Sequence, residues 1–432
     1  MATQPTLAMI PSGYKDGKLY SVLPSDGVGD FTFDRGNGSS TRINKQKLIE
    51  GVSNDVPRLD YGISDCPTLL LEPSRTNLLP YSEEFTNSAW AKSSTTITPF
   101  YSISPDGSAT ASLLQRTSSS ANYMSEAVFK SATATQVTGS WFIKKGNGDF
   151  LATRIQGLYP ARVDLIYQHS TKSIVSVVAN TFTIIDSDVE EYANGFVKIS
   201  LSVLTDSHGS VTFACSPNSD ASQIDGSGSS ADSNVIIWGA QLEVGSYASS
   251  YIPTLTGSSQ TRLAETANGA GNASTFNDSE GVLMYQIKPI SLDGTYKRIT
   301  LSDGTSANRI IMGFDSNNNV TATVYDGVNQ AVLGGDYNAK DELSKYALKY
   351  KVNDFALWVN GFEVSTDTNG NTFPNNTLNQ LKYEDGNGGV DFYGNTKQLQ
   401  YFNTALSDLE IETLTSYTSF NEMVLNFNYT IQ

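Results

Sequence analysis

Val320-Thr321-Ala322-Thr323-Val324-Tyr325-Asp326-Gly327 combines the two signals of an antiparallel β-hairpin. Apolar and polar side chains alternate up to Val324, as they do along a strand that buries one face. The Asp-Gly pair that follows tolerates the positive φ angles of a tight turn. Similar dipeptides occur in this half of the chain at Asp293-Gly294, Asp303-Gly304 and Asn369-Gly370. We therefore predict antiparallel β-structure over residues 280–418.

Residues 63–256 show the same kind of pattern. Runs rich in β-branched and aromatic residues, which favour strands, are separated by clusters of Gly, Asn, Asp and Ser. Short strands at this spacing are typical of a β-sandwich. The sequence thus predicts a mainly β fold with two antiparallel β-sandwich domains. Representative strand runs are Gly139–Lys144, Ser173–Val178, Phe196–Leu201, Ser210–Cys215 and Asn234–Trp238.

The chain has 432 residues, more than one hydrophobic core usually organises. A short helix is expected at Leu406–Leu414, because Ser407 and Glu410 have capping-box spacing. The predicted organisation is an N-terminal extended arm over 1–62, a β-sandwich over 63–256, a linker over 257–279, a second β-sandwich over 280–418 and a C-terminal tail strand over 419–432.

Two interpretations of the arm over 1–62 stay open. Its many turn formers and short apolar pieces cannot fold alone, which favours a segment that orders on a neighbouring molecule. The alternative is a pair of hairpins packed on the first domain. Basic residues gather here, at Arg35, Arg42, Lys45 and Lys47.

Charge and composition exclude several classes of function. The formal net charge is −16, so phosphate backbones and anionic lipids would be repelled, and we expect neither nucleic acid nor a membrane as a partner. No apolar stretch approaches the length that spans a bilayer. The start of the chain resembles no signal peptide, which predicts synthesis in a cytoplasm. Of the two cysteines, Cys66 and Cys215, we expect two buried free thiols, with a disulfide between them as the alternative.

The first half carries a specific set of motifs. Leu70-Leu71-Glu72-Pro73-Ser74-Arg75-Thr76-Asn77-Leu78-Leu79 is followed by Tyr81-Ser82-Glu83, and the half closes on Trp238-Gly239-Ala240-Gln241-Leu242-Glu243 and Ser250-Tyr251-Ile252-Pro253-Thr254. Together with Val56–Tyr61, these motifs resemble the phage head spike fibre domain of tailed bacteriophages, including crAss-like phages. The resemblance covers residues 1–256. We read Arg58, Glu72 and Arg75 themselves as ion-pairing residues that pin an extended chain.

The second half carries a more general signature. Phe355-Ala356-Leu357-Trp358-Val359-Asn360-Gly361 and Tyr401–Asp408 resemble a concanavalin A-like, laminin-G-type sandwich. The two resemblances imply jelly-roll or concanavalin A-like domains in a structural head fibre or spike on the virion surface. They further imply a homotrimer attached to the phage capsid or other virion proteins through the arm.

A search for catalytic chemistry gives no motif-supported site. His169 and His208 lie in polar turns, and no Cys-x-x-Cys or phosphate-binding loop is present. The acidic alternation Asp408-Leu409-Glu410-Ile411-Glu412 falls on the expected helix, where alternate residues diverge, whereas a glycosidase needs two carboxylates that face each other. We therefore expect no catalytic residue and no cofactor. The alternative is Ca²⁺, for which Asp186–Glu191 and Asp315–Asn319 offer oxygen ligands.

Three classes of function follow from these observations. A structural virion protein that binds host-surface or environmental glycans accounts for the β-sandwiches and for the motifs. A polysaccharide-degrading tail spike would need a carboxylate cleft, and a cell-surface lectin or adhesin would need an export signal. For the glycan-binding interpretation, aromatic residues at loops or strand ends are the candidates for stacking on sugars. They are Tyr325, Trp358, Tyr383 and Tyr393.

Overall fold

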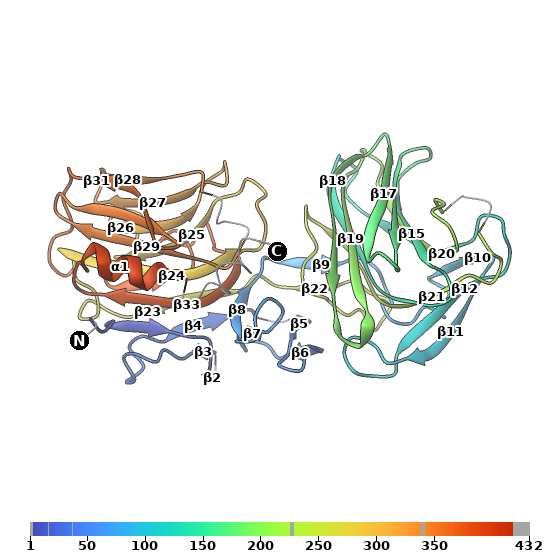
Figure 1. The fold of residues 1–432 in the computed structure, drawn as a ribbon, viewed down its shortest axis with the longest axis horizontal. Helices are drawn as coiled ribbons and strands as arrows, with labels where there is room; N and C mark the ends of the chain where they lie inside the picture. Colours follow the sequence, from blue (N-terminus) through green and yellow to red (C-terminus); the bar gives the residue numbers. More distant parts are fainter. Residues whose placement is uncertain (1–2, 16, 37, 225–228, 338–341, 418–432) are drawn as a thin grey trace, which may run out of the picture. The chain divides into compact units, whose positions relative to one another are not determined.

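The computed structural model describes residues 3–15, 17–36, 38–224, 229–337 and 342–417. These residues form two compact units, each of them built from separate stretches of the chain (Figure 1). The C-terminal unit comprises the described residues of Met1–Gly36, Asn54–Pro73 and Ala264–Gln432. The central unit comprises the described residues of Asn37–Ser53 and Ser74–Leu263. The predicted tail strand over 419–432 lies outside the described residues.

The C-terminal unit is a sandwich of two antiparallel sheets, which we call sheets I and II. Leu7, Phe33, Leu283 and Leu348 are among the residues that fill the core of this unit. Sheet I contains, in spatial order, β31 (Phe362–Asp367), β30 (Phe355–Val359), β29 (Ser344–Lys351), β24 (Glu280–Pro289), β33 (Gly394–Phe402), β8 (Thr68–Leu71) and β7 (Arg58–Asp60), and β1 (Leu7–Met9) also pairs with β33. Sheet II contains β2 (Tyr14–Lys15), β3 (Lys18–Leu19), β4 (Phe31–Asp34), β23 (Thr266–Ala270), β32 (Gln380–Lys382), β25 (Lys297–Ser302), β26 (Arg309–Phe314), β27 (Val320–Tyr325) and β28 (Asn329–Gly335).

The central unit is a second sandwich of two antiparallel six-stranded sheets, III and IV, around a core that includes Trp90, Trp141 and Phe213. Sheet III contains β10 (Ala91–Ser93), β13 (Tyr123–Phe129), β20 (Ser210–Asn218), β15 (Phe150–Gln156), β16 (Arg162–Gln168) and β17 (Ser173–Asn180). Sheet IV contains β11 (Thr95–Ser102), β12 (Ala111–Arg116), β21 (Asn234–Val244), β14 (Gln136–Lys145), β19 (Val197–Leu204) and β18 (Thr183–Glu191). Two small ladders, β5 (Ser40–Ile43) with β6 (Ile49–Val52) and β9 (Arg75–Asn77) with β22 (Gln260–Arg262), and the 3₁₀ turn η1 (Ala193–Gly195) complete the unit.

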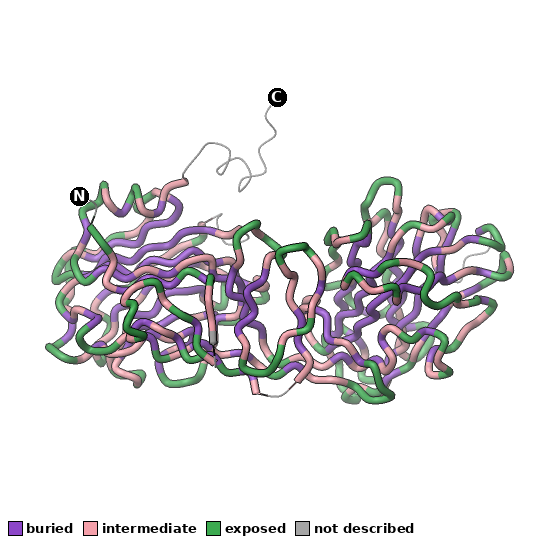
Figure 2. Tube along the Cα trace, turned by 90° about the horizontal axis from the view of Figure 1, so that it is seen from below, coloured by how far each residue is buried: buried purple, intermediate pink, exposed green. Residues whose placement is uncertain are grey.

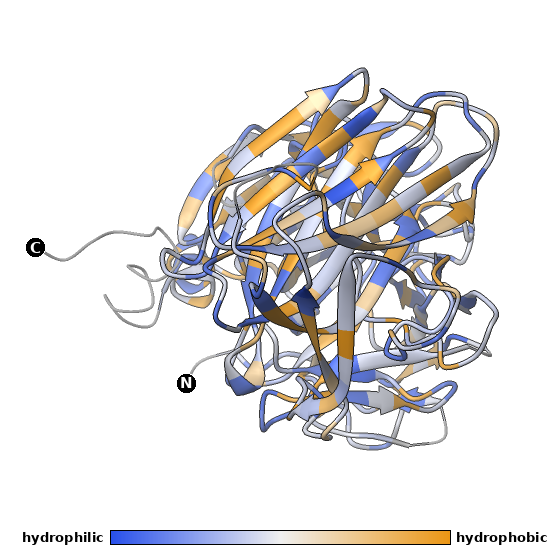
Figure 3. Ribbon diagram, turned by 90° about the vertical axis from the view of Figure 1, so that its right-hand side faces the viewer, coloured by the Kyte–Doolittle hydropathy of each residue, from blue (hydrophilic) through white to orange (hydrophobic). Residues whose placement is uncertain are grey.

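The alternation of side chains explains why these strands form sandwiches. Along β27, Val320, Ala322 and Val324 are buried while the intervening residues are partly exposed, as the sequence predicted. Figure 3 shows the same banding of hydrophobic and hydrophilic residues along other strands, and Figure 2 shows buried segments running through each unit. The predicted mainly β fold with antiparallel β-sandwiches is confirmed.

The expected helix is α1 (Asp408–Thr415), and its capping box is present. The Ser407 backbone N–H and hydroxyl both donate to Oε2 of Glu410, at 2.9 and 2.7 Å. Ile411 of this helix packs with Met284 and Trp358 on the face of sheet I that is turned away from the main core. Among the described residues no helix is long and apolar enough to cross a membrane.

The division of the chain differs from the predicted one at its N-terminus. Leu7 and Met9 of the expected arm are fully buried, because β1 adds to β33 and its side chains enter the core of the C-terminal unit. Residues 38–53 instead belong to the central unit, where the β5–β6 hairpin packs beside Tyr251. The first part of the chain is therefore shared between the two sandwiches.

The expected linker over 257–279 also differs from the prediction. Two parts of it pair as strands: β22 pairs with β9 in the central unit, and β23 pairs with β4 and β32 in the C-terminal unit. Ala267 and Ala270 of β23 are fully buried. Composition alone suggested a flexible connection because the segment is poor in large apolar residues, and alanines such as Ala267 and Ala270 give no sequence signal of burial.

The two cysteines are both free, which agrees with the preferred interpretation. Cys215 is buried in the core of the central unit, and burial raises the pKa of its thiol. Cys66, however, is exposed, which corrects the expectation of two buried thiols. It lies in the connection between β7 and β8.

Candidate functional site

Two of the four predicted sugar-stacking residues lie inside the C-terminal unit. Trp358 is only 6% exposed and packs against the helix residue Ile411. Tyr383 is 2% exposed, with its ring edge-on to Phe31 at a centroid distance of 5.3 Å. Neither ring can reach a sugar, so the prediction is corrected for both residues. Their hydrophobic bodies are used for sheet packing, as is usual for aromatic residues of strands.

The other two predicted residues are partly exposed but stand apart. The Tyr325 ring, at the end of β27, lies 5.9 Å from the guanidinium carbon of Arg309. The Tyr393 hydroxyl donates to Oδ2 of Asp391 at 2.9 Å, and its ring packs on the core of the C-terminal unit. Trp358 lies on the opposite face of sheet I from that core. The four residues therefore do not make a common binding surface.

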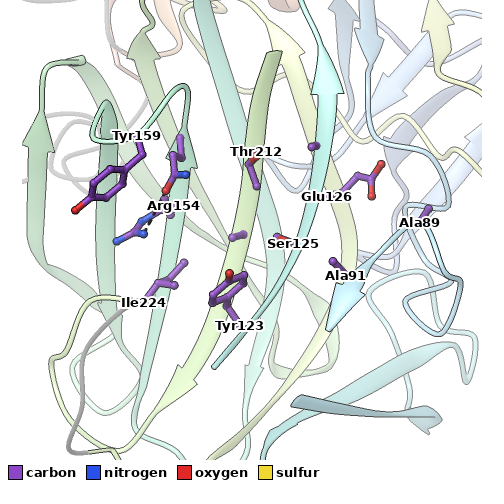
Figure 4. A pocket seen from close by; sticks show the side chains of 12 residues that line it. Ala89, Ala91, Tyr123, Ser125, Glu126, Arg154, Tyr159, Thr212 and Ile224 are labelled. Atoms are coloured by element: carbon purple, nitrogen blue, oxygen red, sulfur yellow. Dashed lines mark hydrogen bonds between the residues drawn. The ribbon is translucent and has the colours of Figure 1, made fainter. Parts of the chain in front are cut away.

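A hollow of about 740 Å³ lies instead on the central unit, over the outward face of sheet III (Figure 4). Its volume falls within the range of small-molecule binding sites. The floor is made by side chains on alternate positions of β13, β20 and β15, whose other positions face the core. Small residues dominate this floor and leave the space above it open. The floor residues are Ala91, Ser125, Ala127, Thr212 and Ala214.

Strand register lines up these residues across the sheet. Ala91 faces Ser125, Ser125 faces Ala214, and Ala214 faces Arg154 on successive strands. A second row runs from Ala127 through Thr212 to Gln156. Neighbouring strands are about 4.8 Å apart, so the first row gives the hollow a floor of about 14 Å across the strands.

Aromatic and aliphatic side chains border this floor. Tyr159 follows β15 in a loop and is 70% exposed, while Tyr123 begins β13 and is half-buried. Ile224 packs on Ala152 and Ala214, with Tyr123 beside them. Figure 4 shows Tyr159 and Arg154 on one side of the floor and Glu126 and Ala89 on the other. The hollow thus has both apolar faces and polar groups within one small area.

Arg154 is the most strongly held polar group of the hollow. Its Nε and Nη2 donate to Oδ1 and Oδ2 of Asp164 at 2.8 and 3.0 Å, a bidentate pair that fixes the plane of the guanidinium. Nη1 donates to the amide oxygen of Gln156 at 3.4 Å. Arg154 is 5% exposed and Asp164 is fully buried. The guanidinium therefore sits in a fixed position at the floor.

Glu126 stands at the opposite side of the hollow. Desolvation by burial raises the pKa of its carboxyl above the ordinary value. Among the described lining residues it is the one carboxylic acid. A glycosidase needs a second carboxyl group across the substrate, and Asp164 does not provide it because two guanidiniums hold its buried carboxylate.

The acidic runs singled out from the sequence serve local structure. Asp315 Oδ1 accepts hydrogen bonds from the backbone N–H groups of Asn317 and Asn319, both at 2.8 Å, so it caps a turn. Asp186–Glu191, the other source of oxygen ligands, lies within the exposed edge strand β18. In the part of the chain that the structure describes, no three His, Cys, Asp or Glu side chains converge as a metal site.

Sequence reasoning missed this hollow for a physical reason. Its floor consists of Ala, Ser and Thr, residue types that carry no chemical signal of their own. Alternation within Leu151–Gln156 shows which side chains face outward, but it does not show that Tyr159 and Ile224, from two different loops, border the same face. Only the exposed dipeptide Leu158-Tyr159, apolar and unpaired with a strand, could have drawn attention to this loop.

Comparisons with known proteins agree with the fold of the C-terminal unit. Residues 272–412 match the family described as the concanavalin A-like lectin/glucanases superfamily. No curated protein sequence matches the chain significantly.

Solved structures that match the chain have low sequence identity to it and low TM-scores. A carbohydrate-binding module (CBM40) of the Ruminococcus gnavus IT-sialidase bound to α2,3-sialyllactose is 18% identical over 34% of this chain and 94% of its own, with a TM-score of 0.28. Mouse laminin α1 domains LG4-5 are 9% identical over 78% and 92%, with a TM-score of 0.24. A tail fibre protein from an E. coli phage is 10% identical over 78% and 42%, with a TM-score of 0.23. The family match therefore supports a concanavalin A-like fold for residues 272–412.

Proposed function

We propose that this chain is a non-catalytic, glycan-binding subunit of a surface fibre or spike of a tailed bacteriophage. The observation that carries the glycan-binding part is the hollow on sheet III, with its small floor, its two tyrosines and its fixed arginine. The virion part is supported by the sequence motifs of residues 1–256, which resemble head spike fibre domains.

The hollow has the chemistry that a saccharide requires. A sugar ring offers apolar C–H faces and a rim of hydroxyl groups. Tyr159 and Tyr123 supply apolar ring faces with a hydroxyl at the tip. Arg154, Gln156, Ser125 and Thr212 supply donors and acceptors for hydroxyl groups. An entirely apolar ligand would cover Ser125 and Thr212 without hydrogen-bonding to them, which costs free energy.

The family match supports a binding role for the second sandwich as well. The superfamily description names lectins and glucanases, which are binding and hydrolytic proteins. Binding is favoured over hydrolysis here because Asp408, Glu410 and Glu412 lie on the helix α1, where their side chains point in different directions. We propose that the chain has no enzymatic activity.

A glycan array tests the binding proposal. The wild-type protein should bind a subset of glycans, and Tyr159→Ala should lower that affinity about tenfold, since stacking contacts of this kind contribute about 1 kcal/mol or more. Tyr101→Ala is the matched control, because Tyr101 is a 55% exposed tyrosine of sheet IV that does not line the hollow. Equal loss in both variants would place binding elsewhere, and no binding by the wild type would contradict the proposal.

Three further measurements test the other parts. Release of reducing sugar from a bound polysaccharide would contradict the non-catalytic role. Antibodies against the chain should label the surface of purified virions in electron micrographs. The resemblance also leads us to expect a homotrimer. Sedimentation at the 46.7 kDa of one chain, at micromolar concentration, would contradict the trimer.

A further inference from the structure

A second hollow adjoins the first on the same outward face of sheet III. Its volume is about 420 Å³ and it lies over β16 and β17. Arg162 is the charged residue among its described lining residues. Its other lining residues are apolar or carry neutral polar groups: Ile166, Ser176, Val178, Ala221, Ser222 and Gln223.

One carboxylate connects the two hollows. Oδ2 of Asp164 accepts hydrogen bonds from Nη2 of Arg154 at 3.0 Å and from Nε of Arg162 at 3.2 Å. Arg154 lines the first hollow and Arg162 the second. The strand row through Ala214 and Arg154 continues through Asp164 to Val178, so the two hollows lie along the same line across the sheet.

Arg162 also contacts the aromatic border of the first hollow. Its guanidinium carbon lies 5.7 Å from the centroid of the Tyr159 ring. Nη1 donates to the backbone carbonyl of Pro160 at 3.3 Å. The side chain is 18% exposed, whereas that of Asp164 is 1% exposed. A ligand stacked on Tyr159 therefore lies beside a positively charged group that reaches the solvent.

Two positive charges meet one buried carboxylate at this junction. The guanidiniums of Arg154 and Arg162 share Asp164, in a chain whose net charge is −16. Glu126 stands on β13, three strand spacings or about 14 Å from β16, beyond the distance at which salt screens exposed charges. Asp206, near Gly157, is accompanied by Lys130, whose ammonium donates to the Asp206 backbone carbonyl at 2.9 Å.

We propose that the second hollow binds the carboxylate-bearing residue of an acidic saccharide, while the neighbouring sugar stacks on Tyr159 in the first hollow. Arg162 is the counter-ion of that carboxylate, and the buried Asp164 orients it. Partial burial strengthens such a charged hydrogen bond relative to one in water. This inference rests on the proposed glycan-binding function. It adds that the ligand is negatively charged and extends across both hollows.

The experiment compares paired ligands by isothermal titration calorimetry. The panel contains uronic-acid and sialic-acid oligosaccharides, each beside the same oligosaccharide with its carboxylates reduced to alcohols. The wild-type protein should bind the acidic member about fivefold to tenfold more tightly than the neutral one. The difference should shrink as the salt concentration rises, because the charge pair is partly exposed.

Three variants separate the possible results. Arg162→Gln should abolish the preference for the acidic member over the neutral one. Tyr159→Ala should weaken both members alike. Lys172→Gln is the matched control. Lys172 lies in the turn before β17, outside both hollows, and its substitution removes the same charge from an exposed ion pair with Glu191. It should leave the preference intact.

The outcomes distinguish this inference from the function on which it rests. Equal wild-type affinity for acidic and neutral members would overturn the acidic-ligand inference and leave glycan binding supported. A preference that survives Arg162→Gln would overturn the role of Arg162. Failure of the wild type to bind any member of the panel would overturn both the inference and the proposed function.

Discussion

Nε of Arg58 lies 2.8 Å from Oε1 of Glu265, a residue that is 207 positions further along the chain. Nη1 of Arg58 donates to Oε2 of Glu72 at 2.6 Å, and Arg35 donates to Glu265 at 3.1 Å. All four side chains are buried within the C-terminal unit. The sequence predicted that Arg58 and Glu72 pin an extended chain, and the structure confirms their ion pair. The structure also shows Glu265, the residue before β23, which pairs with both Arg35 and Arg58.

Removal of one member of this buried network should destabilise the C-terminal unit strongly. In Glu265→Gln, two guanidiniums lose their main counter-charge while they stay buried, which typically costs about 3–5 kcal/mol of the free energy of unfolding. Urea denaturation measures this loss. Lys351→Gln, which breaks an exposed pair with Glu280 in the same unit, is the control and should cost less than about 1 kcal/mol. Similar losses in the two variants would contradict the prediction.

The core of the central unit should not accept a methyl group at Gly139. A Cβ at this position of β14 would overlap the ring of Phe213, which is stacked on Trp141 at a centroid distance of 4.8 Å. Overpacking of this kind typically costs about 1–3 kcal/mol, so Gly139→Ala should lower the denaturation midpoint of this unit. Gly51→Ala, in the same unit, adds its methyl group to open space and should not lower it. A stable Gly139→Ala variant would show that the two rings can shift.

The two cysteines should differ sharply in reactivity. Cys66 is exposed, whereas Cys215 is buried and its pKa is raised, so little thiolate is available there. A maleimide should therefore modify one thiol per native chain and two thiols in denaturant, as mass spectrometry would show. Cys66→Ser should abolish the native modification. Rapid labelling of Cys215 in the native protein would instead indicate that the central core opens readily.

Local patterns predicted the strands well, and long-range relationships account for what was missed. The alternation at Val320–Tyr325 shows which side chains are buried, because a strand places successive residues on opposite faces. Nothing in Leu7–Met9 indicates that its partner in the sheet is β33, almost the whole chain away. The sequence therefore suggested an extended arm, because it does not reveal that β1 pairs with the distant strand β33.

The same limit applies to the candidate site. Trp358 and Tyr383 were predicted as sugar-binding residues by their type, but type alone does not distinguish an exposed ring from a buried one. The first hollow on sheet III depends on which residues are small, Ala91, Ala127 and Ala214, and on loops that border them. A binding site formed by the absence of large side chains gives no positive signal in a single sequence.

Glu83 should make the stability of the central unit depend on pH. Burial raises the pKa of its carboxyl to about 7, although a hydrogen bond from the Tyr251 hydroxyl at 3.0 Å partly offsets the effect. Because the folded pKa lies above the ordinary value of 4.5, the native state retains the proton between about pH 4.5 and 7 while the unfolded chain loses it. The free energy of unfolding should therefore fall as the pH rises through this window, and the loss is complete above about pH 7.

Glu83→Gln isolates this contribution, because glutamine resembles the protonated carboxyl and does not titrate. Relative to the wild type, the variant should be more stable by about 1–3 kcal/mol at pH 8 and no more stable at pH 4, as urea denaturation at the two values would measure. Glu84→Gln is the control, since Glu84 is the exposed neighbour in the same turn. If Glu83→Gln and the wild type lose stability in parallel as the pH rises, then Glu83 is ionised in the folded protein and its burial does not govern the titration.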